Sequence, residues 1–173
     1  FTTTDEYDLV FAGLISFVDP PKASAKQALS SLLANGIRVK VITGDSELVA
    51  KDVCNKLDFD VHFSLSGNEI QSLDDAVLVA KVEYTDLFYA ISPTQKSRII
   101  TALKQRGHIV GYLGDGINDA SSLHIADIGI SVANAVDVAK ESSDIVMLNN
   151  DLNILYKAII IGRRTFANTM KYI

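Results

Sequence analysis

The feature that most constrains the fold is the alternation of short apolar runs with amphipathic stretches along the chain. The apolar runs cover residues 37–42, 87–91, 108–113, 128–132 and 145–148, and a segment with apolar residues at helical spacing follows each of them. Repeats of strand and helix favour parallel strands with helices packed on the sheet. We therefore predict an α/β protein with a mostly parallel sheet flanked by helices.

Further segments complete the predicted order of elements. The apolar residues 9–18 predict another strand, which Pro20 and Pro21 close because proline lacks the N–H that a sheet ladder requires. The middle of the chain is less regular, and there a short strand at 61–63 and a turn at 66–68 are predicted. Helices are predicted over residues 22–35, 47–57, 73–81, 93–106, 120–126, 136–141 and 152–172.

Composition limits the class of protein. A chain of 173 residues with 48% hydrophobic residues has enough apolar material for one core, so we predict one domain over residues 1–173. No stretch approaches the roughly 20 consecutive apolar residues of a membrane helix. The net charge of −5 argues against a nucleic-acid partner. A single cysteine, Cys54, excludes an intrachain disulfide and a cysteine-based zinc cluster.

Residues 43–45 (TGD) form the first candidate site, directly after a predicted strand. Parallel α/β sheets bind ligands at the carboxyl ends of their strands. The hydroxyl of Thr43, the amide of Gly44 and the start of the next helix would together hold an anionic oxygen. Asp45 completes the turn. The alternative is ordinary helix capping, for which these residue types are common.

Lys96 is the second candidate. It lies in the first turn of a helix that Ser92, Pro93 and Gln95 predict, through a capping serine, a proline at the first helical position and a glutamine three residues past the cap. Positive charge is unfavourable at a helix N-terminus, and a bound anion would offset that cost. The alternative is a solvated lysine on an exposed face.

Residues 114–119 (GDGIND) are the most specific feature. An apolar strand delivers Asp115, Asn118 and Asp119 into one glycine-rich loop, and hard oxygen ligands of this kind suit Mg²⁺. A turn whose carboxylates only cap the next helix is the alternative. Together with residues 43–45 and Lys96, the loop predicts a Mg²⁺-dependent phosphate site, since phosphoryl transfer needs a metal and positive charge around the phosphoryl oxygens. No attacking group is evident from the residues alone.

These motifs, in this order and spacing, resemble the phosphorylation domain of P-type cation-transporting ATPases, in the haloacid dehalogenase-like superfamily. The sequences of these motifs are most similar to those of bacterial magnesium-transporting or proton-pumping members. The resemblance implies a three-layer, Rossmann-like fold and covers nearly the whole chain. It rests on DPPK at 19–22, TGD at 43–45, PTQK at 93–96, GDGINDA at 114–120, ADIGISV at 126–132, AKESSDIV at 139–146 and GRRTFAN at 162–168.

The resemblance also implies residue roles. Thr43 and Gly44 would bind the transferring phosphoryl group of ATP, Asp45 would support their loop, Lys96 would neutralise phosphoryl charge and Asn118 would orient phosphoryl oxygens. The remaining implied roles are in metal binding and in a hinge. Asp115 would ligate Mg²⁺, and Asp119 would complete or support the metal site. Asp19, Pro20 and Pro21 would form the hinge where the chain returns from the nucleotide-binding domain.

One motif of the family is absent. Its Asp-Lys-Thr-Gly-Thr sequence, whose aspartate accepts the phosphate, occurs nowhere in these 173 residues. We therefore expect the chain to be the C-terminal part of such a domain, inactive alone. In the family fold the strand that carries this aspartate lies between the strands ending at Ile42 and at Leu113. We expect residues 9–18 to fill that position, or the chain to self-associate through it, because an unpaired strand edge invites pairing.

The parent protein implied by the resemblance is an ATP-driven cation pump. Residues 152–173 would lead toward its membrane stalk, and this chain would be a cytoplasmic domain of an integral membrane protein, in the cell membrane. Its partners would be the nucleotide-binding, actuator and transmembrane domains, and the transported cation would bind elsewhere. Two alternatives stay open: a soluble phosphatase of the same superfamily and a non-catalytic metal- or nucleotide-binding module. The order of the motifs argues against a receiver-type signalling domain, which would place its acidic pair after the first strand and its lysine after the last, whereas here the acidic loop follows the lysine.

Overall fold

The strands form two parallel sheets in a computed structural model that describes residues 10–15, 20–149 and 151–172. Each sheet has three strands, in the orders β1-β3-β2 and β4-β5-β6. The register pairs Val41 with Leu87 in the first sheet and Tyr112 with Gly129 in the second. The bounds are β1 Val41–Ile42, β2 Ser64–Ser66, β3 Leu87–Tyr89, β4 Gly111–Leu113, β5 Ile128–Val132 and β6 Ile145–Met147.

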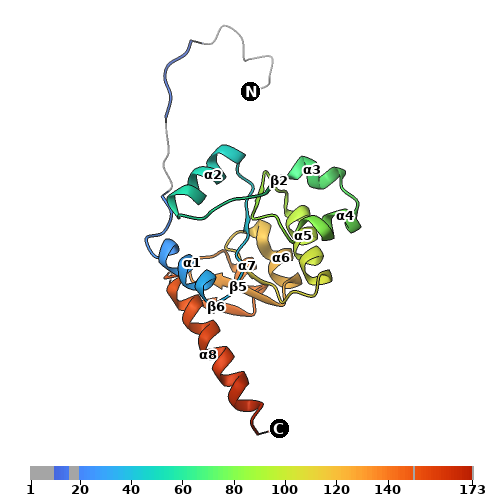
Figure 1. The fold of residues 1–173 in the computed structure, drawn as a ribbon. Coiled ribbons are helices and arrows are strands. Elements are labelled where there is room, and N and C mark those ends of the chain that lie inside the picture. The colour runs from blue at the N-terminus through green and yellow to red at the C-terminus, as the bar shows by residue number, and fades with distance from the viewer. Residues whose placement is uncertain (1–9, 16–19, 150, 173) are drawn as a thin grey trace.

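Helices surround the two sheets (Figure 1). They are α1 Ala25–Ala34, α2 Glu47–Lys56, α3 Gly67–Ser72, α4 Asp75–Lys81, α5 Pro93–Gln105, α6 Ala120–Ile125, α7 Asp137–Glu141 and α8 Asn153–Thr169, with a 3₁₀ turn, η2, at Ile117–Asp119. The α/β class and the parallel pairing of the strands are confirmed. Within the described part of the chain the strands pair as two sheets, with β1 at the end of one and β4 at the end of the other.

Helix α5 joins the two sheets. Two consecutive residues of α5, Ile99 and Ile100, are both fully buried. Ile99 belongs to the core of the first sheet and Ile100 to the core of the second. Ile42 and Val110 pack against both cores. A third, smaller core lies under α2 and includes Cys54. The halves of the molecule therefore meet along α5.

The beginning of the chain differs from the sequence-based expectation. Residues 10–15 form no strand, lead away from the body of the protein (Figure 1), and are exposed, as Leu14 shows with 89% of its surface accessible. The described part of the 9–18 run therefore does not fill a position beside β1 or β4. Leu9, residues 16–18 and Asp19, to which a hinge role was assigned, lie outside the described residues.

The middle of the chain shifts by a few residues. The expected strand at 61–63 is β2, which begins at Ser64, and the expected turn at 66–68 is instead the start of α3. The reason is a capping box: the Ser66 hydroxyl accepts from the Glu69 amide, and the Glu69 carboxylate accepts from the Ser66 amide. These two bonds satisfy orphan donors, so the chain turns directly into a helix.

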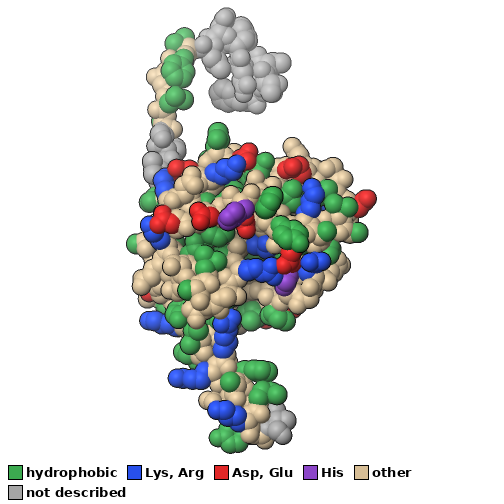
Figure 2. Space-filling view, in the orientation of Figure 1, with side chains coloured by type: hydrophobic (Ala, Val, Ile, Leu, Met, Phe, Trp, Pro, Cys, Tyr) green, Lys and Arg blue, Asp and Glu red, His purple; other side chains and the backbone are tan. Residues whose placement is uncertain are grey.

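Helix α8 packs on α1 and then projects beyond the body (Figure 1). Figure 2 shows hydrophobic and basic side chains along the projecting part, where Ile161 and Phe166 are exposed. No helix in the described part of the chain is long and apolar enough to cross a membrane. The expected approach of residues 152–173 to a membrane stalk stays a prediction.

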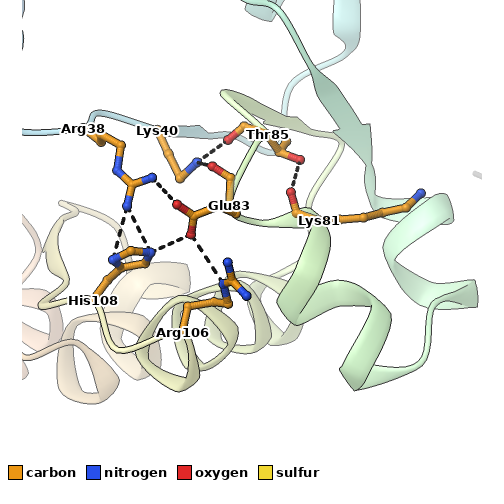
Figure 3. Close-up of polar contacts among 7 residues, drawn as sticks. All are labelled: Arg38, Lys40, Lys81, Glu83, Thr85, Arg106 and His108. Atoms are coloured by element: carbon orange, nitrogen blue, oxygen red, sulfur yellow. Dashed lines mark hydrogen bonds and ion pairs between the residues drawn. The ribbon is translucent and has the colours of Figure 1, made fainter.

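A polar cluster centred on Glu83 connects the amino ends of strands from both sheets (Figure 3). The Glu83 carboxylate accepts from Arg38, which precedes β1, and lies 2.7 Å from Nε2 of His108, which precedes β4. Arg106 forms a longer ion pair, and Lys40 donates to the Glu83 carbonyl at 3.1 Å. The Glu83 side chain is only 16% exposed. This cluster therefore holds the two sheets together at the edge opposite the candidate site.

Replacing Glu83 with glutamine is expected to destabilise the protein at neutral pH. Hydrogen bonds from Arg38 and His108 lower the pKa of Glu83 from 4.5 to about 2. A lowered carboxyl pKa contributes stability that is present above the ordinary pKa and is lost as the pH falls through the folded value. The deficit of Glu83→Gln against the native protein should therefore shrink between about pH 4.5 and 2.

Urea unfolding over that pH range measures the deficit. The control is Glu47→Gln, which removes only an exposed pair with Lys51 on α2. A Glu83→Gln deficit that stays constant as the pH falls would contradict the assignment of this stability to an ionised carboxylate.

Candidate active site

Residues 43–45 form a braced turn at the carboxyl end of β1. The Thr43 hydroxyl donates to the Asp45 carboxylate at 2.9 Å and accepts from the Asp45 amide at 3.1 Å. The Thr43 and Asp45 carbonyls accept from the amides of Ile91 and Ala90, in the loop after β3. Gly44 is exposed. The Thr43 oxygen is thus held in place, and the Gly44 backbone is accessible to a ligand.

Lys96 contacts Asp119. Its Nζ lies 2.7 Å from Oδ1 of Asp119, and the two side chains are only 13% and 11% exposed. The lysine reaches this position because the capping box of Ser92 and Gln95 starts α5 with the expected proline, which fixes the first helical turn. The solvated-lysine alternative is therefore wrong for Lys96.

Asp119 is charged in its buried position. Burial alone would raise the pKa of Asp119, but hydrogen bonds from Lys96 and from the Tyr112 hydroxyl outweigh it, and the pKa is lowered. The Tyr112 hydroxyl donates to Oδ1 at 2.7 Å, and the Gly116 amide donates to Oδ2 at 3.2 Å. Both carboxylate oxygens therefore already accept hydrogen bonds.

Gly114 allows this arrangement. A Cβ atom at Gly114 would lie 2.6 Å from the Asp119 Cβ, closer than non-bonded carbon atoms approach, and 3.0 Å from Cε1 of Tyr112, which is a tight contact. Asp115 and Asn118, in contrast, are exposed. The Asp115 backbone carbonyl accepts from the Val136 amide, which fixes the loop against the start of α7. The loop thus buries one carboxylate and presents the other.

Replacing Gly114 with alanine is expected to lower the free energy of unfolding by about 1–3 kcal/mol, the usual cost of an overpacked site. The matched control is Gly162→Ala on α8, where an added Cβ meets nothing within 4 Å. That control should be neutral or slightly stabilising, because alanine favours helix. Urea denaturation measures both variants. Equal stability of Gly114→Ala and the native chain would show that the loop adapts without moving Asp119.

The structure brings together some predicted site residues and not others. Lys96 and Asp119 form a contact pair, and Thr43 contacts Asp45. Among the described residues, no hydrogen bond or ion pair links residues 43–45 to Lys96 or Asp119. A surface hollow of about 470 Å³ is lined by none of these residues but by Lys51, Asn55, Phe59, Asp60, Val61 and His62.

The donor set bears on metal binding. In the part of the chain that the structure describes, no three His, Cys, Asp or Glu side chains cluster as a metal site. Asp115 and Asn118 fit a hard cation such as Mg²⁺, because both present exposed oxygen atoms. Such an ion would complete its shell with water and substrate oxygens, as Mg²⁺ commonly does.

Sequence analysis missed Tyr112. It lies in the middle of the apolar run 108–113, and its position within a buried strand indicated only a core residue. The structure confirms the burial, at 8% exposure, but also places the hydroxyl on Asp119. The available signal was its phenol, since a buried tyrosine usually finds a hydrogen-bond partner.

The comparison with known proteins defines the class. Residues 2–127 match the haloacid dehalogenase-like hydrolase model. The chain therefore belongs to the haloacid dehalogenase-like hydrolase family, and the expected fold relationship is confirmed.

The particular relatives are P-type ATPases. The chain is 50% identical over 169 residues to "Magnesium-transporting ATPase, P-type 1" of Salmonella typhimurium, covering 98% of this chain and 19% of that protein. It is 35% identical over 168 residues to "Calcium-transporting ATPase type 2C member 1" of Homo sapiens, covering 95% of this chain and 18% of that protein. The chain thus spans about a fifth of the length of these relatives.

Solved structures agree. A zinc-transporting PIB-type ATPase in its E2.Pi state matches with a TM-score of 0.71 and 27% identity, covering 88% of this chain and 21% of that chain. The catalytic domain of a CPx-ATPase matches with a TM-score of 0.62 and 29% identity, covering 80% of this chain and 45% of that chain.

Proposed function

We propose that this chain is part of the phosphorylation domain of an ATP-driven, P-type cation pump. The observation that carries the proposal is the buried Lys96–Asp119 pair beside the exposed Asp115 loop, in a chain with 50% identity to a magnesium-transporting ATPase over 98% of its length. A lysine and carboxylates at the carboxyl ends of parallel strands suit phosphoryl transfer.

Each site residue has its own role in the proposed phosphoryl transfer. Lys96, directed by Asp119, neutralises charge on the transferring phosphoryl group, and the Gly44 amide donates to its oxygens. The Thr43 hydroxyl has one proton, so on binding it donates to a phosphoryl oxygen in place of the Asp45 carboxylate. Asp115 holds Mg²⁺, with Asn118 nearby to orient phosphoryl oxygens and Asp119 in a supporting role. When bound, Mg²⁺ supplies positive charge that stabilises the phosphoryl oxygens of ATP in the transition state. Asp45 keeps the Thr43 turn in place.

The transported cation of the proposed pump is Mg²⁺. Identity to the magnesium-transporting relative, at 50%, exceeds identity to the calcium-transporting relative, at 35%, over nearly the same length. The cation would cross through a transmembrane domain, with nucleotide-binding and actuator domains as further partners. This chain would then lie on the cytoplasmic side of the cell membrane.

A soluble phosphatase of the same superfamily is the second candidate. The match to the hydrolase model ends at residue 127, which favours a generic catalytic core. Similarity to the magnesium-transporting relative, however, covers 98% of the chain, and α8 projects from the body with apolar and basic side chains exposed. These two observations favour the pump.

Phosphoenzyme formation by the full-length protein tests the proposal. Membranes that contain it are incubated with Mg²⁺ and ATP labelled on the γ-phosphate, and acid-quenched protein is analysed for label. The pump predicts covalent label that hydroxylamine removes, as expected for an aspartyl phosphate. Hydrolysis of small phosphate esters without ATP-derived label would support the phosphatase instead.

We expect this chain itself to bind Mg²⁺ weakly. Asp115 is the one exposed carboxylate of the loop, so a bound Mg²⁺ ion would keep water as most of its ligands. Adding Mg²⁺ should shift the amide resonances of residues 114–119 in NMR spectra. Asp115→Asn should abolish these shifts, while Asp137→Asn, at an exposed position on α7, should leave them unchanged. Equal shifts in native chain and Asp115→Asn would place the metal elsewhere.

A further inference from the structure

We infer that Tyr112 is a positioning residue for the phosphoryl-transfer site, because its hydroxyl holds the carboxylate that directs Lys96. This inference rests on the proposed function for its meaning in the reaction, but the contact itself belongs to the described chain. Tyr112 Oη and Lys96 Nζ both lie 2.7 Å from the same atom, Oδ1 of Asp119.

The three groups come from three elements. Tyr112 lies in β4, Lys96 in the first turn of α5, and Asp119 at the end of η2. An ion pair through one carboxylate oxygen leaves the carboxylate free to turn about the bond to its Cβ. A second donor on Oδ1 and the Gly116 amide on Oδ2 remove that freedom. Asp119 therefore presents Lys96 with a fixed acceptor.

The surroundings make the Tyr112 hydroxyl a dependable donor. Burial, and next the Asp119 carboxylate, raise the pKa of Tyr112 above its ordinary value, so the phenol keeps its proton. The ring is 8% exposed and packs in the core of the second sheet. Gly114 lies so close to Tyr112 and Asp119 that no side chain fits between them.

Two roles for Tyr112 make different predictions. A ring that only fills the core is replaced by phenylalanine without consequence, because the substitution conserves nearly all of the volume. A hydroxyl that fixes Asp119 is lost in the same substitution. Tyr112→Phe therefore separates packing from positioning, and Tyr84→Phe on the exposed Tyr84 is the matched control for removing a phenol.

The first measurement follows the Lys96 ammonium in this chain by ¹H–¹⁵N NMR. In the native chain, the buried and hydrogen-bonded ammonium should exchange its protons slowly enough to be observed. In Tyr112→Phe, we expect exchange about tenfold faster, since a hydrogen bond to a charged group has been lost. Tyr84→Phe should exchange like the native chain. Unchanged exchange in Tyr112→Phe would overturn the inference.

The native chain provides a second measurement that needs no folded variant. The Tyr112 hydroxyl proton should appear as a separate, slowly exchanging resonance in the spectrum of the native chain at low temperature. A Tyr112 hydroxyl that exchanges as fast as that of the exposed Tyr84 would overturn the inference, even where Tyr112→Phe fails to fold.

The third measurement uses the full-length protein. Tyr112→Phe should lower the kcat of ATP hydrolysis about tenfold with little change in KM for ATP, because positioning acts on the chemical step. An unchanged kcat with native-like folding would overturn the role in the reaction. If the unsubstituted protein forms no phosphoenzyme, the proposed function fails while the NMR result for Tyr112 and Lys96 still stands, so the two failures are distinguishable.

Discussion

Replacing Lys96 with alanine in the full-length protein is expected to slow phosphoenzyme formation by about 10²–10³-fold, the usual effect of removing one preorganised charge from a transition state. The Lys96 ammonium is nearly buried, and its position is set by Asp119, so neither water nor a neighbouring lysine replaces it. Helix α5 should survive, because alanine is a strong helix former. Loss of the cation also leaves the buried Asp119 carboxylate with only the Tyr112 and Gly116 donors, so stability falls as well and the fold is checked beside the rate.

Rapid-quench labelling with ATP measures the rate, and circular dichroism of the same preparation measures the fold. Lys56→Ala is the control, since Lys56 forms only an exposed pair with Asp52 on α2. The expected loss is about 10²–10³-fold. A rate of phosphoenzyme formation in Lys96→Ala within about threefold of the native rate would therefore refute the role of Lys96.

The second large effect concerns the edges of β1 and β4 with which no strand in the described part of the chain pairs. The Val41 amide donates to Asp86, directly before β3, and the Thr43 amide donates to Phe88 in β3, so alternation directs the Ile42 amide away from that strand. The Gly114 amide likewise donates to β5, which directs the Leu113 amide away. In a longer polypeptide that supplies the aspartate-bearing strand, we expect these two amides to exchange with solvent at least about 10²-fold more slowly than in this chain.

Hydrogen exchange followed by NMR measures this difference. The amides of Phe88 and Ile130, in the central strands β3 and β5, are the controls and should be slow in both polypeptides. Because residues 10–15 are exposed, this chain is also expected to self-associate through these edges of β1 and β4, which light scattering after size-exclusion chromatography detects. A monomer whose Ile42 and Leu113 amides are already protected would contradict both expectations.

Much of the fold followed from local sequence signals. The serine, proline and glutamine at the start of α5 define a helix start through backbone chemistry alone, and the apolar run at residues 128–132 matches β5. The errors arose where two local signals compete. At Ser66 a turn and a capping box share the same residue types, and the contact with Glu69 decides the outcome. For residues 10–15, apolarity predicted a strand without a partner strand to pair with.

The site was predicted as a set of positions but not as a set of contacts. Sequence position placed Lys96 and Asp119 at the same sheet edge, yet their pairing joins residues 23 positions apart and depends on how α5 lies on the second sheet. The contribution of Tyr112 depends on a single oxygen atom at the end of a core side chain. The metal roles of Asp115 and Asp119 stay predictions, and the occupied oxygens of Asp119 favour Asp115 as the direct ligand.

The position of α5 between two cores has a consequence for cooperativity. Because Ile99 and Ile100 face different sheets, a fluctuation that detaches α5 from one sheet also strips a buried residue from the other. The two sheets should therefore unfold together as one unit, although among the described residues no hydrogen bond of the strand ladders joins them. Opening at low free energy should be confined to parts outside this unit, such as α2 with its separate small core and the projecting end of α8.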